Sequence, residues 1–132
     1  MRKKPRITEA EWPIMKVLWE RETATAAEIV DIVTRSRDIS MRTIKTLIRR
    51  LIAKNMITFT PDARDARIYH YKALISQEEG VRDKNQSILS LVYEGNAGEL
   101  LANFVENARL NSGEIDRLRA LLEKKQAEAD DD

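Results

Sequence analysis

Cationic and hydroxyl side chains between residues 39 and 54 recur every three or four positions, and so do apolar ones. At about 100° per residue on a helix, the two sets fall on opposite faces. The basic face holds Arg42, Lys45, Thr46, Arg49 and Arg50, and the apolar face holds Ile44, Leu47, Ile48, Leu51 and Ile52. The helix has no acidic residue, so it can pack on a core and present its cations to a polyanion. The same pattern alone is equally compatible with a solvated surface helix.

The residues before this stretch predict a shorter helix and a tight turn. Thr25 and Glu28 have the capping-box spacing, which predicts a helix over about 25–35. Ser40 is suited to cap the basic helix, and Asn55 suits the left-handed position that ends a helix. Two short helices in this order, the second basic on its outer face, predict a helix-turn-helix.

Two short runs rich in β-formers follow and predict a hairpin. The runs span residues 57–60 and 67–71, with a polar, turn-forming segment between them. A hairpin directly after a helix-turn-helix is the wing of a winged helix. Arg64 and Arg67 near its tip are placed to reach a phosphate backbone, although they could equally be solvated loop charges.

The N-terminal segment predicts a helix with an ambiguous start. Thr8 and Glu11 form another capping box, which favours a helix over about 8–20. Pro13 would then remove a helical hydrogen bond. We therefore expect either an irregular first turn or a helix that begins later, near Trp12.

The C-terminal part is predicted to hold three helices with apolar stripes. They span about 76–94, 97–109 and 112–128. A segment of about 55 residues is marginal as an independent domain, so we expect it to pair with a second copy of itself. The alternative is that it folds back on the N-terminal module as one monomeric domain. The residues expected at the dimer contact are Leu89, Val92, Leu100, Leu101, Phe104, Val105, Ile115, Leu118 and Leu122.

Charge divides the chain near the same place. Residues 1–72 hold 16 Lys and Arg against 9 Asp and Glu, whereas residues 73–132 hold 7 against 13. The net charge of +1 therefore conceals a basic half and an acidic half. This asymmetry suggests a basic module for a polyanion joined to a module with another task, and we expect domains at 1–75 and 76–132.

The residue inventory argues against an enzyme, a metal site and a membrane protein. With no cysteine and a single histidine, His70, no metal cluster and no Ser/His/Asp or Cys/His catalytic set can be assembled. None of the four glycines lies in a phosphate-binding loop. No stretch approaches the ~20 apolar residues of a membrane span, and the lack of cysteine fits a reducing cytoplasm. We expect a cytoplasmic protein with no cofactor, no metal and no membrane insertion.

Several segments resemble the penicillinase-repressor family, also called BlaI/MecI/CopY. They are Ile-Thr-Glu-Ala-Glu-Trp at 7–12, Met-Lys-Val-Leu-Trp at 15–19, Thr-Ala-Ala-Glu-Ile at 25–29, the run from Ser40 to Leu51, Tyr69-His-Tyr71 and Leu101-Ala-Asn-Phe-Val-Glu106. The resemblance implies a mainly α fold with a small β-hairpin, built as a winged helix-turn-helix domain and a C-terminal three-helix dimerisation domain. It also implies a dimeric transcriptional repressor that binds a palindromic operator in double-stranded DNA.

In this family the second helix of the motif reads operator bases in the major groove. By position, the reading residues correspond to Ser40, Arg42, Thr43, Thr46 and Arg50. Arg42 could bond a guanine through two hydrogen bonds, and Thr43 and Thr46 could contact a base edge or a thymine methyl. The cations better suited to phosphates are Lys45, Arg49 and Arg50.

The resemblance also implies a route of inactivation. In the β-lactam-responsive members, a membrane sensor metalloprotease leads to cleavage between an Asn and a Phe of the dimerisation helix, and the matching residues are Asn103 and Phe104. The alternative is that this pair only packs in a core. A copper-responsive branch uses C-terminal cysteines, which this chain lacks. A different class of protein, a winged-helix module that docks a partner protein without binding DNA, would favour apolar residues on the exposed face of 40–54, and they are absent.

Overall fold

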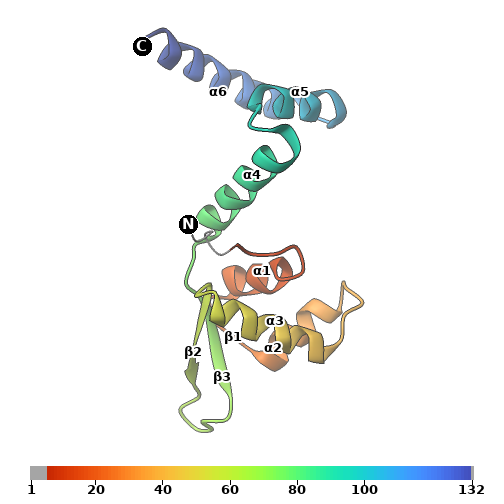
Figure 1. Cartoon of the computed structure of the whole chain (residues 1–132), viewed down its shortest axis with the longest axis vertical. Helices are drawn as coiled ribbons and strands as arrows, with labels where there is room; N and C mark the ends of the chain where they lie inside the picture. Colours follow the sequence, from red (N-terminus) through yellow and green to blue (C-terminus); the bar gives the residue numbers. More distant parts are fainter. Residues whose placement is uncertain (1–5, 132) are drawn as a thin grey trace. The chain divides into compact units, whose positions relative to one another are not determined.

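In the computed structural model, residues 6–131 are described and the chain divides into two compact units, Met1–Ser87 and Ile88–Asp132. In chain order the elements are α1 (Trp12–Arg21), β1 (Ala24–Thr25), α2 (Ala26–Thr34), α3 (Met41–Ala53), β2 (Ile57–Pro61), β3 (Tyr69–Ala73), α4 (Gln77–Tyr93), α5 (Ala97–Asn107) and α6 (Ser112–Asp130) (Figure 1). The predicted mainly α fold with a winged helix-turn-helix is confirmed.

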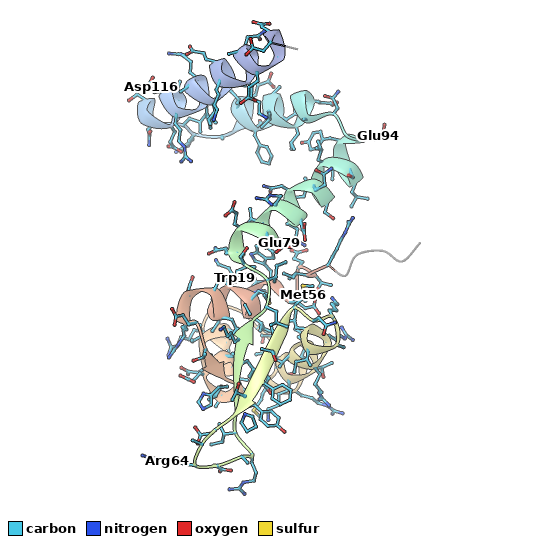
Figure 2. All side chains as sticks on the ribbon, turned by 90° about the vertical axis from the view of Figure 1, so that its left-hand side faces the viewer. Trp19, Met56, Arg64, Glu79, Glu94 and Asp116 are labelled. Carbon is cyan, nitrogen blue, oxygen red and sulfur yellow. The ribbon has the colours of Figure 1, made fainter. Side chains whose placement is uncertain are left out.

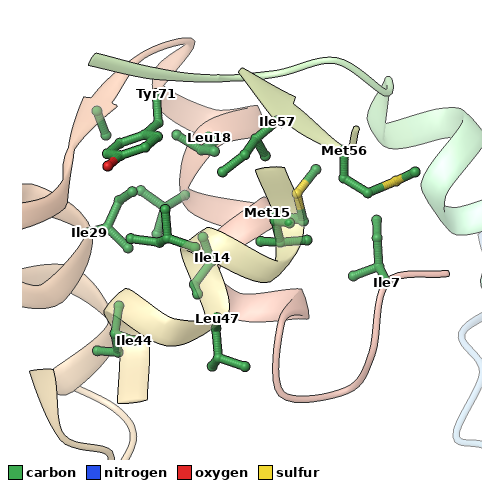
Figure 3. Close-up of a cluster of buried hydrophobic side chains, with 14 of the residues drawn as sticks. Ile7, Ile14, Met15, Leu18, Ile29, Ile44, Leu47, Met56, Ile57 and Tyr71 are labelled. Carbon is green, nitrogen blue, oxygen red and sulfur yellow. The ribbon is translucent and has the colours of Figure 1, made fainter. Parts of the chain in front are cut away.

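The core of the first unit lies between α1, α2, α3 and the small sheet. Figure 3 shows side chains of α1 between those of α2, α3 and β2. The fully buried apolar side chains include Ile14, Met15, Leu18, Ile29, Ile44, Ile48, Leu51 and Ile57. The apolar stripe predicted for α3 is therefore buried at Ile44, Leu47, Ile48 and Leu51, whereas Ile52 is only partly buried. Each such side chain contributes about 1.5–3 kcal/mol on burial, so this stripe fixes which face of α3 remains outside.

The first helix begins at Trp12, so the predicted range of 8–20 is wrong at its start. Thr8 and Glu11 do make both capping-box bonds, with the Thr8 amide 2.8 Å from Glu11 Oε1 and the Glu11 amide 3.2 Å from Thr8 Oγ1. These bonds close a turn that precedes the helix. Pro13 then lies in the first helical turn, where its missing N–H removes no helical bond.

The caps predicted for α2 and α3 are present. Thr25 and Glu28 bond each other's backbone amides, and Ser40 Oγ accepts a hydrogen bond from the Thr43 amide at 3.1 Å. At the other end of α3, Asn55 has φ 60°. The Met56 amide donates to Leu51 O at 2.9 Å, which turns the chain directly into β2.

The sheet has three antiparallel strands in the order β1-β3-β2. The predicted hairpin forms between β2 and β3, but β3 begins at Tyr69 rather than at Arg67. The additional strand β1 was not predicted. It is only two residues long and pairs Ala24 with Tyr71 and Thr25 with His70, so its partner lies far away in the sequence.

The last three helices agree with the ranges expected for them to within a few residues. Residues 77–87 of α4 belong to the first unit, and the end of α4 with α5 and α6 forms the second. Helix α4 ends at Tyr93, and the following Gly95 has φ 86° and donates its amide to Leu89 O at 3.0 Å. Across residues 6–131, no helix has both the length and the hydrophobicity to cross a membrane.

Candidate nucleic-acid interface

The outer face of α3 carries four cationic side chains. Arg42, Lys45, Arg49 and Arg50 are all exposed, because the apolar stripe holds the opposite side of the helix in the core. Among the residues that the structure describes, none of these four cations has an acidic partner. A row of free cations on one helix face is suited to phosphates and to base edges.

The hydroxyls of α3 are held by hydrogen bonds within the helix. Ser40 Oγ lies 2.9 Å from Thr43 Oγ1 and also accepts the Thr43 amide. Thr46 Oγ1 donates to Arg42 O at 3.1 Å. Ser40 is thus occupied as the helix cap, whereas Thr46 keeps a lone pair and a methyl group for an outside contact.

The tip of the β2–β3 hairpin is organised by one carboxylate. Asp62 Oδ2 accepts the amides of Arg64 and Asp65 at 3.0 and 3.1 Å, and Asp62 Oδ1 lies 2.8 Å from His70 Nε2. The hydrogen bond from His70, followed by those amides, lowers the pKa of Asp62. The structure therefore gives His70 a partner in the hairpin, while the side chain of Arg64 is exposed at the tip (Figure 2).

Arg67 differs from Arg64 because its charge is compensated. Its Nε and Nη2 atoms lie 3.0 Å from the two carboxylate oxygens of Asp65, which is a two-pronged ion pair. The same contact lowers the pKa of Asp65 and raises that of Arg67. Arg67 can still bond a phosphate with its remaining N–H groups, but its approach is tied to the position of Asp65.

A groove of about 590 Å³ separates α3 from the hairpin. Its lining comes from three elements: Thr25, Ala26 and Ala27 at the start of α2, Lys45, Ile48, Arg49 and Ile52 of α3, and Arg67, Ile68, Tyr69 and Tyr71 of the hairpin. The uncompensated cations Lys45 and Arg49, with the remaining N–H groups of Arg67, make this groove favourable for a phosphate-bearing chain. The sequence-based prediction did not include Tyr69 among the site residues, although the alternation of β3 places it on the same face as Tyr71.

Aromatic stacking stiffens the hairpin side of the groove. The rings of Phe59 and Tyr69 have centroids 4.4 Å apart, and Tyr71 lies 6.2 Å from Phe59. These residues form a row on one face of β2 and β3, with Tyr71 buried and the other two partly exposed. The hairpin is thus held by packing as well as by its ladder of hydrogen bonds.

Comparison with known proteins establishes the family. The sequence model described as "Penicillinase repressor" matches residues 7–124, nearly the whole chain. The chain belongs to the penicillinase repressor family. The methicillin resistance regulatory protein MecI of Mammaliicoccus sciuri is 34% identical over 119 residues, which are 90% of this chain and 94% of MecI. The penicillinase repressor of Staphylococcus aureus is 32% identical over 120 residues, with 91% of this chain and 93% of the relative covered.

A solved structure supports the same assignment for the winged-helix part. The monomeric form of Bacillus licheniformis BlaI, in complex with the blaP half-operator, matches with a TM-score of 0.50 and 28% identity. The match covers 60% of this chain and 93% of BlaI in that structure. As a member of the penicillinase repressor family, the chain is a DNA-binding repressor and not an enzyme.

Proposed function

We propose that this repressor binds a palindromic operator in double-stranded DNA as a homodimer, with α3 of each copy in a major groove. The observation that carries the proposal is the free basic face of α3. The structure of BlaI on a half-operator supports one winged-helix domain for each half-site. Two domains on a palindrome add specificity that one small domain cannot supply.

The side chains of α3 divide into two tasks in this proposal. Arg42, the second residue of the helix, is free to bond a guanine with two parallel hydrogen bonds, and Thr43 and Thr46 lie beside it for a base edge or a thymine methyl. The cations assigned to phosphates are Lys45, Arg49, Arg50, Arg64 and Arg67. Ser40 serves chiefly to hold the start of the helix.

The homodimer is supported by apolar side chains that the second unit leaves uncovered. Leu91 is 84% exposed and Val92 63% exposed, and neither α5 nor α6 contains a buried residue. A unit this small with so little buried surface is marginal alone, so a second copy is the partner that would cover it. The dimer contact would be formed by Leu89, Val92, Leu100, Leu101, Phe104, Val105, Ile115, Leu118 and Leu122.

Proteolysis between Asn103 and Phe104, reached through a membrane sensor metalloprotease, is the proposed route of inactivation. Both residues are exposed, yet they lie inside α5, where Asn107 Nδ2 donates to Asn103 O at 2.8 Å. A protease needs an extended substrate, so α5 must open before cleavage, and a unit with so little buried surface opens readily. Mass spectrometry of the repressor from induced cells tests this: fragments ending at Asn103 are expected, and an intact chain under full induction would contradict it.

The test of DNA recognition is Arg42→Ala measured against a set of duplexes. Binding-site selection first yields the operator, and affinity is then measured for it and for each single base-pair change. Loss of the two hydrogen bonds from Arg42 costs about 1–3 kcal/mol on the operator and relaxes specificity at one base pair. Lys45→Ala should instead weaken binding to all duplexes alike and reduce the salt slope by about one.

A matched control is Arg117→Ala, which removes one exposed cation from α6 and should leave affinity for DNA unchanged. Two results would overturn the proposal: no affinity for any duplex at low ionic strength, or a chain that stays monomeric at micromolar concentration. Salt-insensitive capture of a protein without affinity for DNA would favour the protein-docking module instead.

A further inference from the structure

The start of α4 contacts α1 at a distance that only glycine allows. Gly80 is buried, and a Cβ atom built on it would lie 2.9 Å from Cη2 and 3.0 Å from Cζ2 of Trp19. Figure 2 shows Trp19 and Met56 at the end of the winged-helix domain where α4 begins. Real Cβ atoms do not come this close to a ring carbon, so any larger residue at position 80 must displace either the ring or the helix.

Trp19 is not free to move aside. Its Nε1 donates to Ile75 O at 2.9 Å, and its ring lies edge-to-face against Trp12 with centroids 5.2 Å apart. Lys84 Nζ lies over the Trp12 ring at 5.8 Å from its centroid. These contacts hold both tryptophan side chains in place, so the Trp19 ring is not free to yield to a Cβ atom at position 80.

Residues Arg6–Thr8, here called the N-terminal strap, join α3 to α4. Lys54 at the end of α3 donates to Arg6 O at 2.9 Å, and Lys84 of α4 donates to Ile7 O at 2.9 Å. Arg6 Nη1 in turn donates to Ser87 Oγ at 2.5 Å. The side chain of Ile7 is buried beside Met56 (Figure 3), and its Cδ1 would lie 3.7 Å from a Cβ at position 80.

We propose that this α4 seat, formed by Ile7, Trp19, Gly80 and Lys84, fixes the direction in which α4 leaves the winged-helix domain and thereby selects the separation of the two half-sites. The inference rests on the proposed function, since it assumes a dimer on a palindrome. Helix α4 has 17 residues, or about 26 Å at 1.5 Å per residue. From Gly80 to its last residue, Tyr93, the helix spans about 20 Å, so a tilt of about 10° at the seat would move its far end by about 3.4 Å, the rise of one base pair.

The test uses the full chain with Gly80→Ala and two kinds of DNA. One is a short duplex with a single half-site, and the other is a series of palindromes whose half-sites are moved apart one base pair at a time. The variant should bind the half-site within about twofold of the wild type, because α3 is untouched. On the wild-type spacing it should lose on the order of tenfold or more in affinity, and its preferred spacing should shift.

Rescue separates a positioning role from a general loss of folding. Trp19→Phe combined with Gly80→Ala removes the ring atoms that the new Cβ meets, so the wild-type spacing preference should return. Gly98→Ala is the matched control, because its nearest contact for a Cβ is 3.6 Å, and it should change nothing. Lys84→Met keeps Gly80 and removes the bond to Ile7 O together with the cation over the Trp12 ring, so it should broaden the range of accepted spacings.

The results distinguish this inference from the proposed function. A wild-type chain without any spacing preference would contradict the proposed dimer on a palindrome. A wild-type preference that Gly80→Ala and Lys84→Met leave unchanged would overturn the role of the seat. Equal losses on the half-site and on every palindrome would also overturn it, since they would show damage to the winged-helix domain itself. If Gly80→Ala does not fold, the Lys84→Met series alone decides between these outcomes.

Discussion

Lys54→Met should destabilise the winged-helix unit strongly, because it leaves a carboxylate buried without its counter-charge. Glu11 is fully buried, and its Oε1 accepts from Lys54 Nζ at 2.6 Å and from the Thr8 amide at 2.8 Å. Its Oε2 has no hydrogen-bond partner among residues 6–131. Burial by itself would raise the pKa of Glu11, but the bonds from Lys54 and Thr8 outweigh it and the pKa is lowered.

The magnitude follows from the burial of the pair. Removing one partner of a buried ion pair costs about 3–5 kcal/mol, and Lys54 is 26% exposed, so a value near the lower end, about 3 kcal/mol, is expected. For a unit of this size that corresponds to a Tm lower by about 12–24 °C. Arg35→Met is the matched control: its pair with Asp31 is 69% and 65% exposed and should contribute less than about 1 kcal/mol.

The assay is urea unfolding at fixed protein concentration between pH 7 and pH 4. In the wild type the lowered pKa of Glu11 gives stability that is present above its unfolded pKa of about 4.3 and is lost as pH falls through the folded pKa. In Lys54→Met, burial without the cation raises the pKa of Glu11, so protonation relieves the penalty. The difference in the free energy of unfolding between the wild type and Lys54→Met should therefore become smaller towards pH 4.

A second variant guards against effects of the methionine itself. Glu11→Gln combined with Lys54→Met replaces the charged pair by neutral groups and should recover part of the lost stability. Two results would contradict the role of the Glu11–Lys54 pair. One is a difference in the free energy of unfolding below about 1 kcal/mol at pH 7. The other is a difference of about 3 kcal/mol that stays the same from pH 7 to pH 4.

Three further changes test local features. Asp62→Ala should speed amide hydrogen exchange at Arg64 and Asp65, which lose their acceptor, and NMR measures it; unchanged rates would contradict the role of Asp62. Asn55→Ala should lower the free energy of unfolding by about 1–2 kcal/mol because of the positive φ, whereas Asn55→Gly should not. Thr25→Ala should cost about 1 kcal/mol through loss of the α2 cap, again measured in urea.

The sequence predicted local features well, namely the helix caps and the two faces of α3. The caps at Thr25 and Ser40 depend on residues only three positions away, so their spacing is visible without a fold. The periodicity of α3 similarly identified the buried stripe and the basic face. At the start of α1 the capping box and Pro13 gave conflicting signals, and the structure satisfies both by closing the box before the helix begins.

Contacts between distant residues were the part that the sequence could not predict. Strand β1 exists only because Ala24 pairs with Tyr71, and nothing in a two-residue run indicates such pairing. The contact of Gly80 with Trp19 depends on how α4 packs against α1, which the residues around Gly80 do not indicate. The pairing of Arg67 with Asp65 depends on the shape of the hairpin tip, which is set by Asp62.

The two ends of α3 have different roles, because Arg42 is placed for DNA contact and Lys54 bonds to other parts of the fold. Arg42 and Lys54 are 12 residues apart, or about 18 Å along the helix. At one end the side chain of Arg42 has no hydrogen-bond or ion-pair partner among the described residues, so its removal should weaken DNA binding without changing stability. At the other end Lys54 Nζ bonds both Glu11 Oε1 and Arg6 O, which joins α3 to α1 and to the N-terminal strap. Changes at Lys54 should therefore alter the free energy of unfolding and, through the N-terminal strap, the preferred half-site spacing. The folded fraction of such a variant should still bind a single half-site through Arg42.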